Sequence, residues 1–373
     1  MKIVKIKQFQ MKLPLVSAFK TSYGERTEKL FDLFLLEDEK GYQGVGELVS
    51  FEQADYIEET LRMSRQILID ELIPCLFRME FSHPQEIWQA FQPIQGNFMA
   101  KSALETAGWD LYARREKISL QNLFSATKES VSVGVSMGIQ PDATSLLQTA
   151  QSYVDQGYER IKLKIAPGND LGPLRKLRAH FPDLQLMADA NSAYTLADWQ
   201  VFKEMDQLKL SMIEQPFHPR DYVDHGELQK RLKTPICLDE NIRTLEDVKT
   251  AHALKSCQAI NLKIPRVGGI TEARRIMDFC QQNQLLVWLG GMFESGVGRA
   301  LNLHLASQSL FTFPGDLSAY DRYFYDDVVD PKAVLENGKL KVPKKHYGIG
   351  VTLEEEKIKK YCYKELIYKP KEK

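Results

Sequence analysis

The sequence is poor in the residues and runs that mark several classes of protein. Its five cysteines form no CxxC pair, and its seven histidines form no HExxH motif or cysteine–histidine cluster. We therefore expect no zinc site and no disulfide framework, but reduced thiols in a cytoplasmic protein. No run approaches the roughly 18 apolar residues that cross a membrane. The N-terminus also lacks the apolar core of a signal peptide.

An excess of charge of either sign is also missing. The 49 basic and 50 acidic side chains give a net charge of −1, which disfavours nucleic acid or a membrane as a partner. A hydrophobic content of 43% over 373 residues is ordinary for a soluble globular protein with a large core. We expect a soluble cytoplasmic enzyme acting on a small molecule, with a homo-oligomer left open.

The first third of the chain combines strands and helices without alternating them. Residues 2–12 and 28–37 are predicted strands, joined by the polar loop of residues 20–26. Helices are predicted near residues 54–77 and 100–117 from apolar residues at helical spacing. This order predicts an α+β domain, which we place at residues 1–126.

Short apolar strands alternate with helices from about residue 131 onward. Residues 131–137 form the first predicted strand, 285–291 the seventh and 309–316 a weaker eighth, with helices such as 195–209 and 269–283 between strands. The alternation predicts an α/β fold, a (β/α)8-type, TIM-like barrel with a modified last unit. We place this catalytic domain at residues 127–320.

The remaining segment, residues 321–373, has two features of its own. Asn337–Gly338 lies between strand-like runs, which predicts a hairpin. The end of the chain is rich in charge, and we expect it to be solvated.

Five charged residues are spaced by almost one structural repeat, each at the end of an apolar run. The steps between them are 25, 25, 25 and 24 residues, about the length of a strand, a helix and two turns. In a parallel barrel the C-terminal strand ends converge on one mouth, where the active site lies. We therefore expect one charged site formed by Lys164, Asp189, Glu214, Asp239 and Lys263.

The predicted second strand carries a second lysine, Lys162, two residues before Lys164. Because side chains alternate along a strand, both lysines lie on one face. An edge strand with one face exposed to solvent would also explain the two lysines. The register with three later carboxylates instead favours two ammonium groups directed into the barrel, where they need compensating partners.

The three carboxylates suit a hard cation. Mg²⁺, with Mn²⁺ as a substitute, prefers octahedral oxygen ligands, and three carboxylates would leave half of that shell for a substrate carboxylate. The alternative is that Asp189 and Asp239 only cap the following helices, whereas Glu214 is a poor cap. Asn191 either holds a metal ligand in place or is an ordinary loop residue.

Lys263 ends the predicted sixth strand, across the barrel from the second. Lys164 and Lys263 would approach a substrate from opposite faces, with the metal between them. A nearby cation and a second ammonium lower the pKa of a lysine, which suits removal of a proton α to a carboxylate. Arg266 could tune Lys263 or bind an anion, although a surface position is the expectation.

In type and order, these residues resemble the enolase superfamily in its muconate-lactonising-enzyme-like subgroup. The subgroup carries K-x-K on strand two, Asp, Glu and Asp on strands three to five, and Lys on strand six. The resemblance covers nearly the whole chain. It implies that the α+β domain caps the barrel and that the C-terminal segment returns to the cap. The matching residues are Lys162, Lys164, Asp189, Glu214, Asp239 and Lys263.

Two segments narrow the resemblance to one branch. The runs GGMFESGVGRALNLHLAS and FPGDLSAYDRYF resemble the o-succinylbenzoate synthase branch, which includes N-succinylamino acid racemases. Dipeptide epimerases carry an Asp-x-Asp where this chain has Asp316-Leu317-Ser318, which counts against that activity. The GGMFESG segment counts against muconate cycloisomerase.

This branch implies a lyase of menaquinone biosynthesis. Its reaction is α-proton removal and dehydration of 2-succinyl-6-hydroxy-2,4-cyclohexadiene-1-carboxylate. Lys164 would be the base, Lys263 a cation that stabilises the enediolate, and Lys162 a support for both. The alternative is N-succinylamino acid racemase, or both activities, with Lys164 and Lys263 exchanging a proton. A non-catalytic barrel is the remote alternative.

The resemblance also implies contacts with a carboxylate substrate that bears a succinyl group. Cap loops at residues 20–24 and 48–51 would cover this substrate, and residues at the barrel strand ends would line the pocket. The expected substrate-binding residues are Lys20, Ser22, Ser136, Asn191, Gly291 and Phe293.

Overall fold

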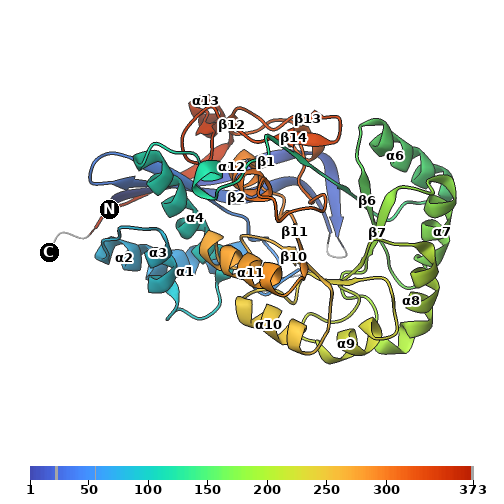
Figure 1. Ribbon diagram of the computed structural model, residues 1–373. Coiled ribbons are helices and arrows are strands. Elements are labelled where there is room, and N and C mark those ends of the chain that lie inside the picture. The colour runs from blue at the N-terminus through green and yellow to red at the C-terminus, as the bar shows by residue number, and fades with distance from the viewer. Residues whose placement is uncertain (22–23, 55, 371–373) are drawn as a thin grey trace.

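The computed structural model describes residues 1–21, 24–54 and 56–370, without the side chains of residues 18–21 and 24–26. These ranges form an antiparallel sheet of four strands, a parallel sheet of seven strands and two small sheets. Helices α6 to α11 surround the parallel strands, and the antiparallel sheet lies beside them with helices α1 to α4 (Figure 1). None of the described helices has the length and apolar character needed to span a membrane.

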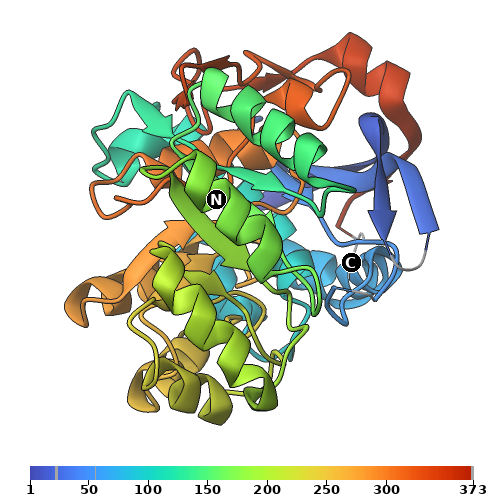
Figure 2. The same cartoon turned by 90° about the vertical axis from the view of Figure 1, so that its right-hand side faces the viewer.

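The antiparallel sheet is built from both ends of the chain, in the order β16-β1-β2-β3. β16 pairs with β1 from Ile6–Tyr368 to Met11–Cys362, so the terminal segments run side by side (Figures 1 and 2). The charge-rich end is therefore more than a solvated tail: it forms the helix α13 and an edge strand, β16, that is largely exposed. The bounds are β1 Ile3–Thr21, β2 Gly24–Asp38, β3 Gln43–Leu48, α13 Glu355–Tyr361 and β16 Cys362–Tyr368.

The helix α4 packs closely on β3 and is buried over most of its length. A Cβ on Gly44 or Gly46 would lie 2.3 or 2.1 Å from the backbone of α4, so only glycine permits this approach. The helix expected near residues 54–77 starts at Leu61, because Thr60 caps it through Met63 N. The bounds are α1 Leu61–Ile67, the π-helix η1 Leu68–Leu72, α2 Ile73–Arg78, α3 Gln85–Phe91, α4 Phe98–Arg115 and α5 Leu120–Leu123.

The parallel sheet runs β5 to β11 in sequence order, as in a barrel of β/α units. Its strands are β5 Val135–Met137, β6 Arg160–Lys164, β7 Gln185–Asp189, β8 Ile213–Glu214, β9 Ile236–Leu238, β10 Ala259–Leu262 and β11 Leu286–Leu289. The helices are α6 Ala143–Asp155, α7 Leu171–His180, α8 Trp199–Met205, α9 Val223–Gln229, α10 Leu245–Ala253, α11 Ile270–Gln282 and α12 Gly296–Ala306. Three 3₁₀ turns add η2 Leu196–Asp198, η3 Asp206–Leu208 and η4 Tyr320–Arg322.

The last barrel unit is modified, as predicted, but the expected eighth strand at residues 309–316 is not a strand. Gly134 N donates to Gly315 O at 2.8 Å, and Asp316 N donates to Leu289 O at 2.9 Å. The segment thus bridges the first and seventh strands with single bonds. Pro314 has no N–H to extend a ladder, and its carbonyl accepts from Arg160.

The first predicted strand is also interrupted, because β4 turns away to a separate sheet with β14 and β13. The hairpin predicted at Asn337–Gly338 is confirmed: both residues have positive φ, 49° and 70°, as this tight turn requires. We retain residues 1–126, 127–320 and 321–373 as a proposed domain division. The remaining bounds are β4 Ser130–Ser132, β12 Val329–Asp330, β13 Leu335–Glu336, β14 Lys339–Lys341 and β15 Thr352–Leu353.

Two buried glutamates bind the N-termini of barrel helices. Glu105 of α4 accepts from Ile270 N at 2.8 Å and Thr271 N at 2.9 Å, at the start of α11. Glu47 of β3 accepts from Ser295 N at 2.8 Å and Gly298 N at 2.9 Å, at the start of α12. Negative charge at these positions satisfies free N–H groups and the helix dipole.

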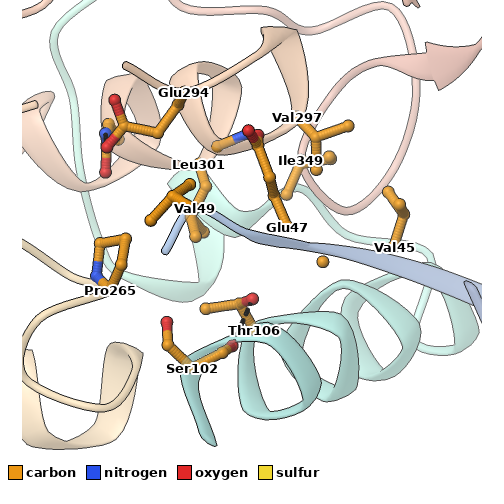
Figure 3. Close-up of a pocket in the computed structure, with 13 residues that line it drawn as sticks. Val45, Glu47, Val49, Ser102, Thr106, Pro265, Glu294, Val297, Leu301 and Ile349 are labelled. Carbon is orange, nitrogen blue, oxygen red and sulfur yellow. Dashed lines mark hydrogen bonds between the residues drawn. The ribbon is translucent and has the colours of Figure 1, made fainter. Parts of the chain in front are cut away.

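A small cavity of about 20 Å³ lies between Glu47, α4 and α12, room for about one water molecule. Figure 3 shows Glu47 and Glu294 above α4, which carries Ser102 and Thr106; all four residues line the cavity. The contact between the antiparallel sheet, α4 and α12 therefore combines polar and apolar side chains around a small cavity.

The substitution Glu105→Gln tests how much this contact contributes to stability. Glutamine keeps the shape but loses the charge and one acceptor, so we expect the free energy of unfolding to fall by roughly 2–3 kcal/mol. Denaturant unfolding measures the change. The matched control is Glu116→Gln at the exposed end of the same helix, where we expect less than about 0.5 kcal/mol. Equal effects would contradict the capping role.

Candidate active site

The charged strand ends meet at one edge of the parallel sheet. Lys164, Asp189 and Glu214 stand opposite one another in the register of β6, β7 and β8. Asp239 and Lys263 directly follow β9 and β10. The structure thus brings together all five evenly spaced residues, because each repeat returns the chain to the C-terminal edge of the sheet.

Lys162 lies below this level, with its ammonium among three carboxylates. Its Nζ is 3.1 Å from Asp189 Oδ2, 2.9 Å from Glu214 Oε2 and 2.6 Å from Asp316 Oδ2. Burial would lower the pKa of Lys162, but Asp316 and Glu214 outweigh burial and hold it well above its ordinary value. Lys162 is therefore a fixed cation.

Lys164 is the more open of the strand-end lysines. Its Nζ donates to Asp189 Oδ2 at 2.7 Å and also to the Asn191 side chain. Its side chain is 35% exposed, against 9% for Lys263. Lys164 therefore has a route for protons to and from solvent.

Lys263 belongs to a buried cluster around Asp239. Its Nζ lies 2.8 Å from Asp239 Oδ2 and donates to Tyr56 OH at 2.7 Å. Arg266 binds the other oxygen of Asp239 and donates to Ile242 O at 2.8 Å. The surface position expected for Arg266 is wrong: the residue is 1% exposed, because the chain turns back under the strand end.

The pKa values in this cluster favour ion pairs. Burial would raise the pKa of Asp239, but Arg266 and Lys263 outweigh it and lower the pKa. Burial would lower the pKa of Lys263, but Asp239 outweighs it and raises the pKa. This direction is opposite to the lowered lysine pKa that the sequence suggested, because a carboxylate, rather than another cation, is the nearest charge.

The pKa values of Glu214 and Glu240 are raised, whereas that of Asp239 is lowered. Burial, followed by the charge of Asp189, raises the pKa of Glu214 to about 7. Burial, followed by the charge of Asp239, raises the pKa of Glu240 to about 7. Glu240 Oε2 is buried without a hydrogen-bond partner among the described residues. More negative charge is buried here than the lysines neutralise.

This donor set fits a divalent cation, although the side chains are not arranged around one. Among the described residues, no group of three or more acidic, histidine or cysteine side chains is positioned to hold a metal directly. Lysine ammonium groups lie between the carboxylates of Asp189, Glu214 and Asp239 instead. All three are hard oxygen donors at adjacent strand ends, the type that Mg²⁺ prefers, and a cation would relieve the raised pKa of Glu214.

The expected substrate-binding residues are placed as follows. Ser136 of β5 donates to Asp316 Oδ2 at 3.2 Å, and Asn191 contacts Lys164 and donates to Glu240 Oε1 at 3.1 Å. A Cβ on Gly291 would lie 2.6 Å from Asp316 O. The missing side chain of Gly291 therefore makes room for the backbone of Asp316. Ser22 lies outside the described residues, as does the side chain of Lys20.

Phe293, also expected at the pocket, lies in the loop after β11. It has a φ of 60°, and its ring lies 4.3 Å from that of Tyr323. Its carbonyl accepts from Lys29 of β2. The antiparallel sheet therefore holds this loop directly.

Comparison with known proteins places the chain in a family. The family model described as "Enolase C-terminal domain-like" matches residues 145–357, and that of the "Mandelate racemase / muconate lactonizing enzyme, N-terminal domain" matches residues 3–125. The chain belongs to the enolase superfamily. The resemblance inferred from the strand-end residues is thereby confirmed.

Several relatives of this enolase-superfamily chain match over nearly its full length. It is 55% identical to the o-succinylbenzoate synthase of Enterococcus faecalis, over 97% of this chain and 98% of the relative. It is 40% identical to the N-succinylamino acid racemase of Thermus thermophilus, over 92% of each. A crystal structure of an enolase-superfamily member from Listeria innocua matches with a TM-score of 0.97 and 50% identity, covering 99% of both chains.

Sequence reasoning missed several residues of this superfamily site. Arg160 and Asn261 lie two residues before Lys162 and Lys263, so strand alternation already places them on the inner face. Asn261 Nδ2 donates to Glu214 Oε1 at 2.6 Å. Tyr56 had no local signal, because it comes from the N-terminal domain and reaches the barrel only in the folded chain.

His225 of α9 supports the loop that follows Glu214. Its Nε2 accepts from Phe217 N at 3.2 Å, and its Nδ1 lies 2.7 Å from Asp221 O. Burial lowers its pKa from 6.5 to about 4. The folded state therefore binds fewer protons than the unfolded state between these values, and stability falls as the pH drops through this window.

We expect His225→Gln to reduce this pH dependence. The neutral histidine contributes stability that is fully present above pH 6.5 and is lost toward pH 4, up to about 3 kcal/mol. Glutamine does not titrate, so the free energy of unfolding, measured between pH 4 and 6.5, should fall less steeply. The exposed His180→Gln is the matched control. Identical slopes in wild type and His225→Gln would rule out this role.

Proposed function

We propose that this chain is an o-succinylbenzoate synthase that dehydrates 2-succinyl-6-hydroxy-2,4-cyclohexadiene-1-carboxylate in menaquinone biosynthesis. The observation that carries the proposal is a pair of lysines, Lys164 and Lys263, on strand ends at either side of the three carboxylates at the ends of β7, β8 and β9. Relatives named o-succinylbenzoate synthase are 42–55% identical to the chain over nearly all of its length. The substrate has an acidic Cα–H next to a carboxylate, which this pattern of charges suits.

Mg²⁺, or Mn²⁺ in its place, is the proposed cofactor, held by Asp189, Glu214 and Asp239. When bound, it supplies positive charge that neutralises the substrate carboxylate as the α-proton leaves. Two features support the site: the hard oxygen donors at adjacent strand ends, and the buried Glu240 oxygen without a partner among the described residues.

Lys164 is the proposed base. Once it has released a proton to solvent, its Nζ takes the α-proton from the substrate. The bond from carbon to the hydroxyl group then breaks, and the proton leaves with that hydroxyl group as water while the ring becomes aromatic. The greater exposure of Lys164 supports this role, because a base must exchange protons with its surroundings.

Lys162 and Lys263 are proposed to remain cations. Lys162 is buried against Asp316, and Lys263 is buried against Asp239 and Tyr56, so each presents positive charge toward the negative charge that develops on the substrate. Asn191, which contacts Lys164, holds the base in place.

N-succinylamino acid racemase is the second candidate. Relatives with this name, from Thermus thermophilus and an Amycolatopsis species, are each 40% identical to the chain. The two lysines on opposite sides of the site would then exchange a proton on the two faces of one carbon. Both substrates carry a carboxylate and a succinyl group, so one site could serve both reactions.

An assay of the purified protein with Mg²⁺ on both substrates tests the proposal. We expect dehydration with a larger kcat/KM than racemisation, and loss of both activities on chelation. Lys164→Ala should lower kcat by roughly 10²–10⁴-fold, the usual contribution of a general base. The exposed Lys203→Ala on α8 is the control. Absence of dehydration by wild type, or full activity of Lys164→Ala, would defeat the proposal.

Lys263→Arg separates the two candidate reactions. Arginine keeps the positive charge but cannot act as a base at neutral pH. We expect the variant to retain more of the dehydration rate than of the racemisation rate, each measured relative to wild type. An equal loss of both rates would mean that Lys263 does more in dehydration than provide a positive charge.

A further inference from the structure

Asp316 lies where an eighth barrel strand would end, and its backbone is fixed from three sides. Its N–H donates to Leu289 O at 2.9 Å, and the preceding Gly315 O accepts from Gly134 N at 2.8 Å. Its carbonyl lies so close to Gly291 that a Cβ there would approach to 2.6 Å. The irregular last unit thus places one carboxylate at the edge of the site.

The Asp316 side chain joins two buried cations. Its Oδ1 lies 2.7 Å from Arg160 Nη2, and its Oδ2 lies 2.6 Å from Lys162 Nζ. Ser136 Oγ donates to Oδ2 at 3.2 Å. Asp316 therefore has an ion-pair partner on each oxygen before any substrate binds.

Arg160 provides a rigid support for Asp316. The guanidinium is fully buried and donates to Pro314 O at 2.9 Å. It lies over the rings of Trp288 and Phe313 at 5.4 and 5.8 Å. Any Cβ on Gly134 would overlap the guanidinium at 2.1 Å, so a glycine on the first strand makes room for it.

Lys162 depends on Asp316 once a metal is bound. Two of its three carboxylate partners, Asp189 and Glu214, are the proposed metal ligands. Oxygens that turn to a divalent cation are withdrawn from the ammonium of Lys162, whose side chain is 5% exposed. A buried charge that loses its partners is costly, and a nearby divalent cation adds repulsion. Asp316 is then the carboxylate that remains.

We propose that Asp316 is a positioning residue that holds the Lys162 ammonium when Asp189 and Glu214 bind a divalent cation. When Lys162 pairs with Asp316 instead of Asp189 and Glu214, one site can hold Lys162 and the metal as neighbouring cations. The inference rests on the metal site of the proposed function, but not on which substrate is converted.

A double-mutant cycle on metal binding tests this role without any turnover. Mn²⁺ is titrated into the full chain without substrate, and the free ion is measured by electron paramagnetic resonance. The proteins are wild type, Asp316→Asn, Lys162→Met and the double variant. Asp326→Asn is the matched control, because Asp326 is paired with Lys332 and its side chain is 13% exposed, against 14% for Asp316.

We expect Asp316→Asn to weaken Mn²⁺ binding roughly tenfold, because Lys162 then keeps hold of the metal ligands. In the Lys162→Met background the same change should alter binding less than about twofold, since directly coupled residues are not additive. Asp326→Asn should leave binding unchanged.

Equal weakening in both backgrounds would show that Asp316 acts through its charge alone and would overturn the inference. Unchanged binding by Asp316→Asn, or no Mn²⁺ binding by wild type, would also overturn it. Thermal unfolding checks that each variant folds, and Asp316→Ser replaces Asp316→Asn in the cycle if the latter does not. Failure of the dehydration assay would leave this result standing, so the two proposals fail separately.

Discussion

Like charges that are buried together at the mouth of the barrel must be separated by opposite charges. This constraint determines how the charged side chains of the site are arranged. Five acidic side chains (Asp189, Glu214, Asp239, Glu240 and Asp316) lie there, and four cations (Arg160, Lys162, Lys263 and Arg266) are buried among them. The order of charges around the sheet follows from the strand register. Burial first, and then the neighbouring charges of Asp189 and Asp239, raise the pKa values of Glu214 and Glu240. This buried negative charge is the physical reason for proposing a metal.

The N-terminal domain takes part in the same arrangement. Tyr56 accepts a hydrogen bond from Lys263 and donates one to Asp239 at 3.2 Å. Lys29 donates to the carbonyl of Phe293, and Glu47 and Glu105 bind the two helices that follow the loops after β10 and β11. A shift of this domain would therefore disturb both loops at once. The antiparallel sheet and α4 set the geometry of the site as well as covering it.

The barrel and the charged strand ends were predictable because their signals are local and periodic. The 25-residue step returns the chain to the same edge of the sheet, and two-residue alternation sets the inner face. The same alternation could have identified Arg160 and Asn261. Other features depend on tertiary contacts that no local pattern encodes: Tyr56 arrives from another domain, and Arg266 is buried because the chain turns beneath β10. The eighth strand does not form, because Pro314 has no N–H for a ladder and its carbonyl accepts from the Arg160 guanidinium instead.

The difference between Lys164 and Lys263 bears on which reaction the site favours. A racemase needs two bases that both gain and lose protons, whereas the dehydration needs one base and one constant cation. Lys263 is nearly enclosed and held by Asp239 and Tyr56, and its pKa is raised. Lys164 is more open and contacts an aspartate and an asparagine side chain. This asymmetry matches one base and one fixed cation. For racemisation Lys263 must give up its proton, and a bound metal that draws Asp239 away would remove the charge that raises its pKa. The metal would therefore decide whether Lys263 can act as a base at all.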